Sequence, residues 1–175
     1  MPVFKIGEMF EASGFIVVTT NSFLTSKVEL VMGKGAAYQL KLEVPGIDKT
    51  FGKMIQEKCG HLGRYGLIFN ERYGAAQVKY RFNHKAELSL IRLSMAMLAN
   101  MASKDRNSMY NVNYPGIGNG RLKKGDVYHL LEMLPQNVHV WEKEGGKVYG
   151  IHSRAQSEIV MYPQTNCVGL RCAND

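Results

Sequence analysis

One stretch of the chain, Phe15 to Thr20, restricts the fold more than any other. It reads FIVVTT, so aromatic and β-branched side chains alternate onto both sides of an extended strand. A strand that is apolar on both sides has to be covered on both sides, which is typical of a sheet sandwiched between helices. Turn residues Ser13 and Gly14 precede the run, and Asn21 ends it. We therefore expect a layered α/β fold.

The other predicted elements alternate along the chain, as a layered α/β domain requires. Further strands are predicted at Val3–Ile6, Gly66–Asn70, Ala75–Arg81, Met109–Val112 and Val138–Trp141. Helices are predicted from the glycine loop 31–37 to Pro45, from a cap at Asp48 to Gly60, from a cap at Asn83 to Met101, and near Asp126 to Leu134. A hairpin within residues 144–175, or an extension that wraps the core, would complete the chain.

Composition limits the classes of protein to consider. The 175 residues are 45% hydrophobic and 21% charged, which predicts a single soluble domain with a sizeable core. The sequence has no apolar run of transmembrane length and no signal-peptide pattern, so we expect no membrane partner. The three cysteines form no zinc pattern or disulfide framework, and the five histidines lack ligand spacing. We expect a cytoplasmic protein without a metal or cofactor; its oligomeric state is left open.

The chain is basic, with a formal net charge of +7. This charge favours an anionic partner such as a nucleotide or a nucleic acid. The alternative is that scattered, solvated lysines simply maintain solubility, since the positive residues do not form a block.

Two glycine-rich loops each open a predicted helix. The first is Val31-Met-Gly-Lys-Gly-Ala-Ala37, and the second, which follows a strand, is Asn113-Tyr-Pro-Gly-Ile-Gly-Asn-Gly120. Glycines let consecutive backbone N–H groups turn toward an anion, and a helix N-terminus adds partial positive charge. In such sheets the ligand lies beyond the carboxyl ends of the strands. We therefore expect both loops to face one crevice that holds a diphosphate.

With these loops in place, the chain resembles the macro domain, the ADP-ribose-binding fold. The resemblance covers about residues 3–142 and is carried, in order, by Gly7–Phe10, Phe15–Asn21, Val31–Ala36 and Pro115–Gly120. It implies a three-layer α/β/α domain with a central mixed sheet over residues 1–143, and a C-terminal extension over residues 144–175. ADP-ribose, or a macromolecule that carries it, is the implied ligand.

The Met-Gly-Lys-Gly of the first loop is similar to the lysine-dependent subgroup, which removes ADP-ribose from glutamate or from thymidine in DNA. In that subgroup a lysine just before the long helix is catalytic, and here Lys79 matches it. Its amine would attack the anomeric carbon of the opened distal ribose, with its pKa lowered by burial or by nearby cations such as Arg81 and Lys85. The alternative is a solvated strand lysine.

The chain departs from the glutamate-specific members at one point. They carry an aspartate just after the second loop, whereas here Arg121 and Leu122 follow Gly120 directly. Asp126 is the nearest carboxylate, and we expect it to cap the following helix.

The resemblance also implies the ligand-binding residues. Glu8 stands where the family's acid contacts the adenine amino group, and Asn21 stands near the distal ribose, although it could equally be a strand-end turn residue. Tyr114 would either stack on a ring of the ligand or pack against the crevice wall. The remaining predicted contacts come from the two loops: Met32, Gly33, Lys34, Gly35, Ala36, Pro115, Gly116, Ile117, Gly118, Asn119 and Gly120.

The sequence leaves several functions open. The leading one is ADP-ribose binding with hydrolytic release of ADP-ribose from a modified nucleic acid or acidic protein side chain. The alternatives are a binding module without turnover and a phosphatase acting on ADP-ribose 1″-phosphate. An unrelated nucleotide-binding domain fits poorly, because neither loop has the Gly-x-x-x-x-Gly-Lys-Ser/Thr pattern.

Overall fold

The computed structural model describes residues 1–146. Within them, six strands form one sheet in the order β1-β6-β5-β2-β4-β3. Their bounds are Val3–Ile6 (β1), Phe15–Thr20 (β2), Leu67–Asn70 (β3), Tyr73–Gln77 (β4), Tyr110–Asn113 (β5) and Val138–Glu142 (β6). All neighbours pair in parallel except β3, which is antiparallel to β4, so the sheet is mixed as predicted.

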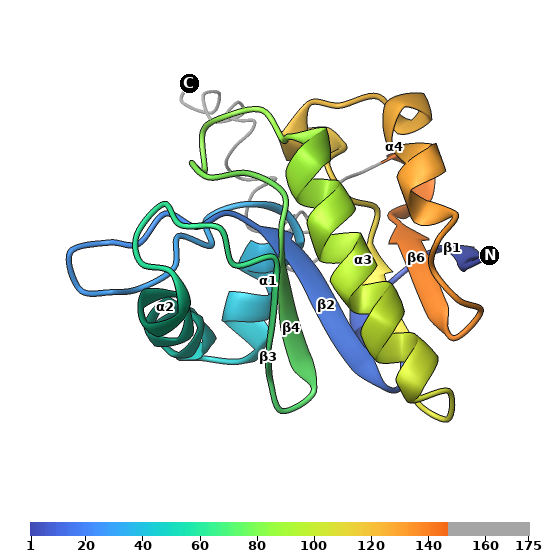
Figure 1. The fold of residues 1–175 in the computed structure, drawn as a ribbon, viewed down its shortest axis with the longest axis horizontal. Coiled ribbons are helices and arrows are strands. Elements are labelled where there is room, and N and C mark those ends of the chain that lie inside the picture. The colour runs from blue at the N-terminus through green and yellow to red at the C-terminus, as the bar shows by residue number, and fades with distance from the viewer. Residues whose placement is uncertain (147–175) are drawn as a thin grey trace, which may run out of the picture.

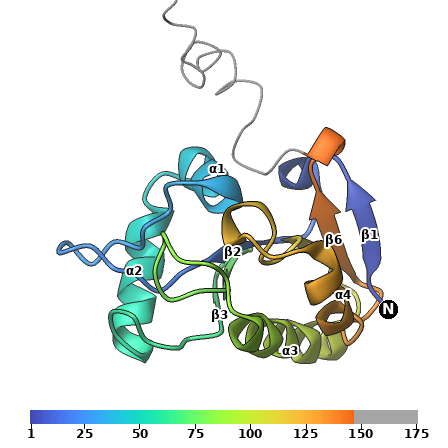
Figure 2. The same cartoon turned by 90° about the horizontal axis from the view of Figure 1, so that it is seen from above.

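Helices cover both faces of this sheet and give three layers (Figure 1). Helices α1 (Gly35–Glu43) and α2 (Ile47–Lys58) lie on one face, and α3 (Leu88–Lys104) and α4 (Lys124–Leu131) lie on the other, as Figure 2 shows from above. Short 3-10 helices at Met9–Glu11 (η1), Gly118–Gly120 (η2) and Glu144–Gly146 (η3) connect these elements. The predicted α/β/α architecture is confirmed.

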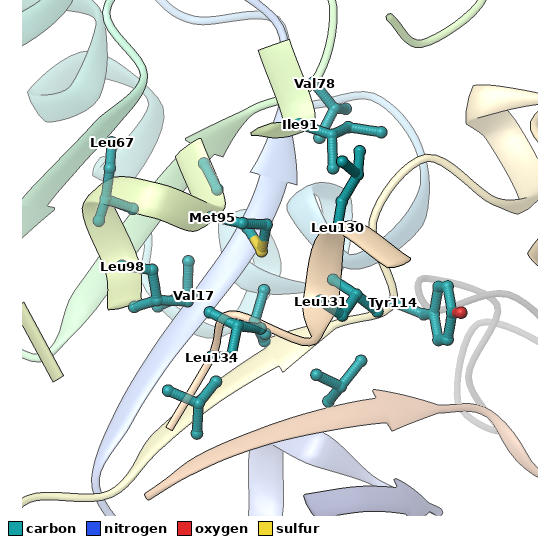
Figure 3. Packing of buried hydrophobic residues seen from close by; sticks show 14 of the residues in the cluster. Val17, Leu67, Val78, Ile91, Met95, Leu98, Tyr114, Leu130, Leu131 and Leu134 are labelled. Atoms are coloured by element: carbon teal, nitrogen blue, oxygen red, sulfur yellow. The ribbon is translucent and has the colours of Figure 1, made fainter. Parts of the chain in front are cut away.

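The central strand β2 joins the two hydrophobic cores. Ile16 and Val18 pack with residues of α1 and α2, whereas Val17 belongs to the cluster under α3 and α4. Figure 3 shows this second cluster, with Met95 and Leu98 close to Val17. All three β2 side chains are almost fully buried. The prediction that the FIVVTT strand is covered on both faces is therefore correct.

The segment between β4 and α3 differs from the prediction. β4 ends at Gln77 instead of Arg81, and α3 begins at Leu88 with Glu87, not Asn83, at its N-cap. The chain leaves the sheet after Val78 and returns where the Glu87 N–H donates to the Val78 carbonyl at 2.8 Å. The excursion reaches the second glycine loop, because the Ala86 N–H donates to the Gly120 carbonyl at 2.9 Å. This long-range contact has no local sequence signal.

Two predicted helix caps are also wrong. Gly46, in a left-handed conformation with φ of 89°, precedes α2, and Asp48 lies inside the first turn, where its carboxylate pairs with Lys41 at 2.9 Å. Lys123 precedes α4, and Asp126 again lies in the first turn. An acid in the first turn still favours the helix through its dipole, so the sequence signal located both helices but misplaced their ends.

The predicted C-terminal hairpin falls within residues 147–175, outside the described residues. The division of the chain after residue 143 therefore stays a prediction. No helix within residues 1–146 is both long and apolar enough to cross a membrane.

The α3 side of the core provides a stability test. Leu98 is fully buried between α3 and the sheet, so Leu98→Ala removes packed methyl groups and leaves a cavity. We expect it to lower the free energy of unfolding by about 2–5 kcal/mol in denaturant titrations. Leu88→Ala on the same helix is the matched control, because Leu88 is 40% exposed and should change stability little. A loss in Leu98→Ala no larger than that of the control would contradict the described packing.

Candidate functional site

A cavity of about 410 Å³ opens beyond the carboxyl ends of β2, β4, β5 and β6. Both glycine loops line it, so the expectation that they face one crevice is correct. The predicted residues that line it are Asn21, Met32, Gly33, Lys34, Gly35, Ala36, Lys79, Tyr114, Gly116, Ile117, Gly118, Asn119 and Gly120. Glu8 and Pro115 are not among the lining residues.

The first loop leads directly into α1. Gly35 begins the helix with φ of 65°, and Ala36 and Ala37 of its first turn also line the cavity. The positive end of the α1 dipole therefore faces this space. A Cβ added at Gly33 would meet no atom within 4 Å, so the backbone there borders open space. A diphosphate could approach this loop closely.

The second loop wraps tightly before α4. Gly116 and Gly118 have φ of 77° and 63°, a region that side chains rarely adopt. The Gly116 carbonyl accepts a hydrogen bond from the Leu122 N–H at 2.9 Å, which closes the loop. Gly118 and Asn119 are exposed, whereas Pro115 and Gly116 are buried against the protein. The exposed rim of the loop is thus available to a ligand, and its base is structural.

Lys79 lies just beyond the end of β4, at the wall of the cavity. It is 8% exposed, so the alternative of a solvated strand lysine is wrong. Its ammonium group donates to two backbone carbonyls, those of His84 and Asn119, each at 3.2 Å. Within residues 1–146 no carboxylate forms an ion pair with it.

Burial lowers the pKa of Lys79, and the positive charges of Arg121 and Lys34 lower it further. The sequence suggested Arg81 and Lys85 as the cations responsible, and this is incorrect. Arg81 lies over the ring of Phe23 instead. Lys34 lies in the first glycine loop and Arg121 directly follows the second, and only the folded chain brings them near Lys79. The lowered pKa increases the fraction of neutral, nucleophilic amine near neutral pH.

A buried polar network that the sequence did not reveal lies beneath this wall. Gln77 is fully buried, and its side-chain oxygen accepts from the N–H groups of Tyr65 and Gly66 at 2.8 and 3.2 Å. Its amide nitrogen donates to Ser22 Oγ and to the Gly63 carbonyl, at 3.1 and 3.0 Å. The Gln77 side chain thus joins the ends of β2 and β4 to the loop before β3. These hydrogen bonds fix the backbone just before Lys79.

Asn21 and Glu8 are both engaged with other protein groups. The Asn21 amide donates to the Val31 carbonyl at 2.9 Å and accepts from the Phe23 N–H at 2.8 Å, so it fastens the first loop to β2 while it lines the cavity. The Glu8 carboxylate pairs with Lys143, and it is Lys143 that lines the cavity. The predicted contact of Glu8 with a base stays a prediction.

Of the two roles expected for Tyr114, the structure shows packing against the crevice wall. It is 4% exposed and belongs to the core cluster, and Figure 3 shows its ring beside Leu131. Its hydroxyl donates to the Lys124 carbonyl at 3.2 Å, and burial raises its pKa to about 12. The ring still forms part of the cavity wall.

Val31, Ala37 and Asn113, from the ends of the two predicted loops, also line the cavity. The sequence analysis did not predict the other lining residues, which are Thr19, Thr20, Val78, Phe82, Asn83, Trp141, Glu142 and Lys143. Asn113 has a clear structural role, since it accepts from the Thr19 N–H at 2.9 Å and donates to Thr19 Oγ1 at 2.8 Å. The position of Asn113 at the end of a predicted strand indicated that it would lie at the edge of the sheet that borders the cavity. Within residues 1–146 no group of histidine, cysteine and acidic residues is arranged to hold a metal ion.

The base of the second loop should tolerate no side chain. A Cβ at Gly116 would approach Ile91 Cδ1 to 2.7 Å and Leu122 Cδ1 to 2.8 Å, at a positive φ. We expect Gly116→Ala to destabilise the protein by about 1–3 kcal/mol in thermal or denaturant unfolding. Gly33→Ala is the matched control in the other loop, where open space predicts little change. Equal stability of the two variants would contradict the described loop.

No protein-family model matches the chain, and no curated protein is significantly similar to it. Solved structures do match. The macrodomain of Thermus aquaticus DarG has 22% identity and a TM-score of 0.62, covering 82% of this chain and 98% of its own. That of Mycobacterium tuberculosis DarG has 19% identity and a TM-score of 0.62, with 81% and 97% covered. Thermosipho africanus DarTG in complex with ADP-ribose has 19% identity and a TM-score of 0.63, with 86% and 42% covered. The chain therefore has the macrodomain fold.

Proposed function

We propose that the cavity binds ADP-ribose, with the diphosphate between the two glycine loops and the distal ribose beside Lys79. The loops supply backbone N–H groups and the α1 dipole, and the cavity extends past them to Trp141 and Lys143 at the end of β6. A neighbour with this fold, Thermosipho africanus DarTG, was solved in complex with ADP-ribose, which supports the choice of ligand.

We further propose that the protein releases ADP-ribose from a modified macromolecule. The observation that carries this step is Lys79, a buried amine at the cavity wall with a lowered pKa. In its neutral form the amine attacks C1″ of the opened distal ribose, and the bond from C1″ to the target group breaks as the target leaves with a proton. Water then displaces the lysine from C1″, which regenerates the amine and releases ADP-ribose.

The surface beside Lys79 favours a nucleic acid over an acidic protein side chain as the target. Phe82 lines the cavity mouth and is 47% exposed, and its ring meets Phe23 edge-to-face with centroids 5.1 Å apart. The Arg81 guanidinium lies over Phe23, 5.8 Å from the ring centroid. The exposed ring of Phe82 suits the stacking of a base, and the neighbouring Arg81 suits the contact of its phosphate. The net charge of +7 acts in the same direction.

The ligand can be tested directly by calorimetry. Titration of ADP-ribose into the protein should show saturable binding, and AMP, which lacks the second phosphate and the distal ribose, should bind more weakly. The reason is that the two loops would lose part of the diphosphate that they surround. Absence of ADP-ribose binding at millimolar concentration would refute the proposed ligand, and with it the proposed reaction.

Turnover can be tested with ADP-ribosylated DNA and ADP-ribosylated protein as substrates. Lys79→Ala should reduce release of ADP-ribose by on the order of 100-fold or more, because it removes the reacting amine. Lys85→Ala, which removes an exposed cation from the same segment, is the control. In the wild type, release should rise with pH as Lys79 loses its proton.

The outcomes separate the alternatives. Equal release by wild type and Lys79→Ala would exclude the lysine mechanism, while binding without any release would identify a binding module. Phosphate release from ADP-ribose 1″-phosphate would instead indicate a phosphatase.

A further inference from the structure

Two cations bridge the same pair of segments beside the cavity. Lys79 donates to the His84 carbonyl on the segment before α3 and to the Asn119 carbonyl on the second glycine loop. Arg121, which directly follows that loop, donates from Nη2 to the Asn83 carbonyl at 3.2 Å. The Ala86 N–H to Gly120 carbonyl bond adds a third link. The amine of Lys79 is thus enclosed by a seam that Arg121 helps to close.

The backbone of Arg121 is itself unusual. Its φ of 61° and ψ of 22° place it in the left-handed region, which glycine adopts with less steric strain than a residue with a side chain. Its N–H donates to the Gly118 carbonyl at 2.9 Å, so this conformation completes the turn of the loop. An arginine at a backbone position that favours glycine is consistent with a role for its side chain.

Two positively charged groups near Lys79 lower its pKa. They are Arg121, just after the second loop, and Lys34, in the first loop, while His84 contacts Lys79 through its backbone carbonyl. None of the four ion pairs found within residues 1–146 includes Lys79. A nearby guanidinium disfavours a second positive charge and therefore favours the neutral amine, whereas a carboxylate would hold the lysine as ammonium.

We propose that Arg121 is a positioning residue for Lys79, which clamps the segment before α3 onto the second glycine loop and, by its charge, favours the neutral form of the enclosed amine. The inference rests on the proposed function for its consequence in catalysis. Its physical content, the state of the Lys79 amine, can be measured without any substrate. Arg121 would then act through Lys79, without contacting ADP-ribose itself.

The substrate-free test is competitive labelling of the full chain with trace acetic anhydride across a pH series. Mass spectrometry of the peptide that contains Lys79 reports how much of its amine is neutral at each pH. In Arg121→Gln and Arg121→Gly the labelling midpoint of Lys79 should move to higher pH, and Arg121→Lys should restore it toward that of the wild type. Lys85→Gln is the control for removal of a nearby cation and should leave the midpoint unchanged.

Arg121→Gly guards against a failure to fold, since glycine suits the left-handed backbone at this position. Because Arg121 is exposed, high salt should shrink the difference between wild type and Arg121→Gln. An unchanged Lys79 midpoint in folded Arg121→Gly would overturn the proposal.

The pH profile of ADP-ribose release adds the catalytic readout. In Arg121→Gln its acidic limb should shift to higher pH, with activity recovering toward the wild-type level in alkaline buffer. A uniform loss at every pH, with the limb in place, would show only a structural role and contradict the proposal. If the wild type releases no ADP-ribose at all, the proposed function fails, and the labelling experiment still decides the inference about Arg121.

Discussion

The whole site depends on the burial of one strand. β2 is covered by helices on both faces and pairs in parallel with β5 on one side and β4 on the other. Parallel neighbours end at the same edge, so the residues that follow these strands, including Asn21, Lys79 and Tyr114, are brought to one rim. The side-chain amides of Asn21 and Asn113 then fasten the rim, because Asn21 donates to the Val31 carbonyl and Asn113 both accepts from and donates to Thr19. The apolar burial of β2 thereby fixes the positions of polar groups that are far apart in the sequence.

Much of this arrangement is predictable from the sequence. The β-branched run gave the central strand, the alternation of elements gave the layers, and the glycines marked both loops at the cavity. The element ends were predicted less well, because the polar residues that can cap a helix also serve elsewhere: Asp48 pairs with Lys41, and Asn83 lies on a segment held by the second loop. Local sequence could not show contacts that span 38 residues, as the one between Asn83 and Arg121 does.

For the site, the sequence predicted that Lys79 lies near the loops, but it did not reveal the surroundings of this lysine. The low exposure of Lys79 follows from the path of residues 79–87, which leave the sheet where a continued strand was expected. The cations that act on it, Lys34 and Arg121, are distant in the chain and meet only after folding. Gln77, which supports the same wall, reads in the sequence as an ordinary polar strand residue. Residues such as Gln77 are recognised only in the structure, by their burial and by the number of backbone groups to which they hydrogen-bond.

The enclosed amine of Lys79 also links chemistry to stability. In the unfolded chain this group titrates near 10.5, and in the folded chain its pKa is lower, so the native state binds fewer protons. By thermodynamic linkage, Lys79 makes stability rise with pH between the lowered and the ordinary value, and below that window the charged amine opposes folding. Burial of this amine therefore lowers the stability of the fold at neutral pH.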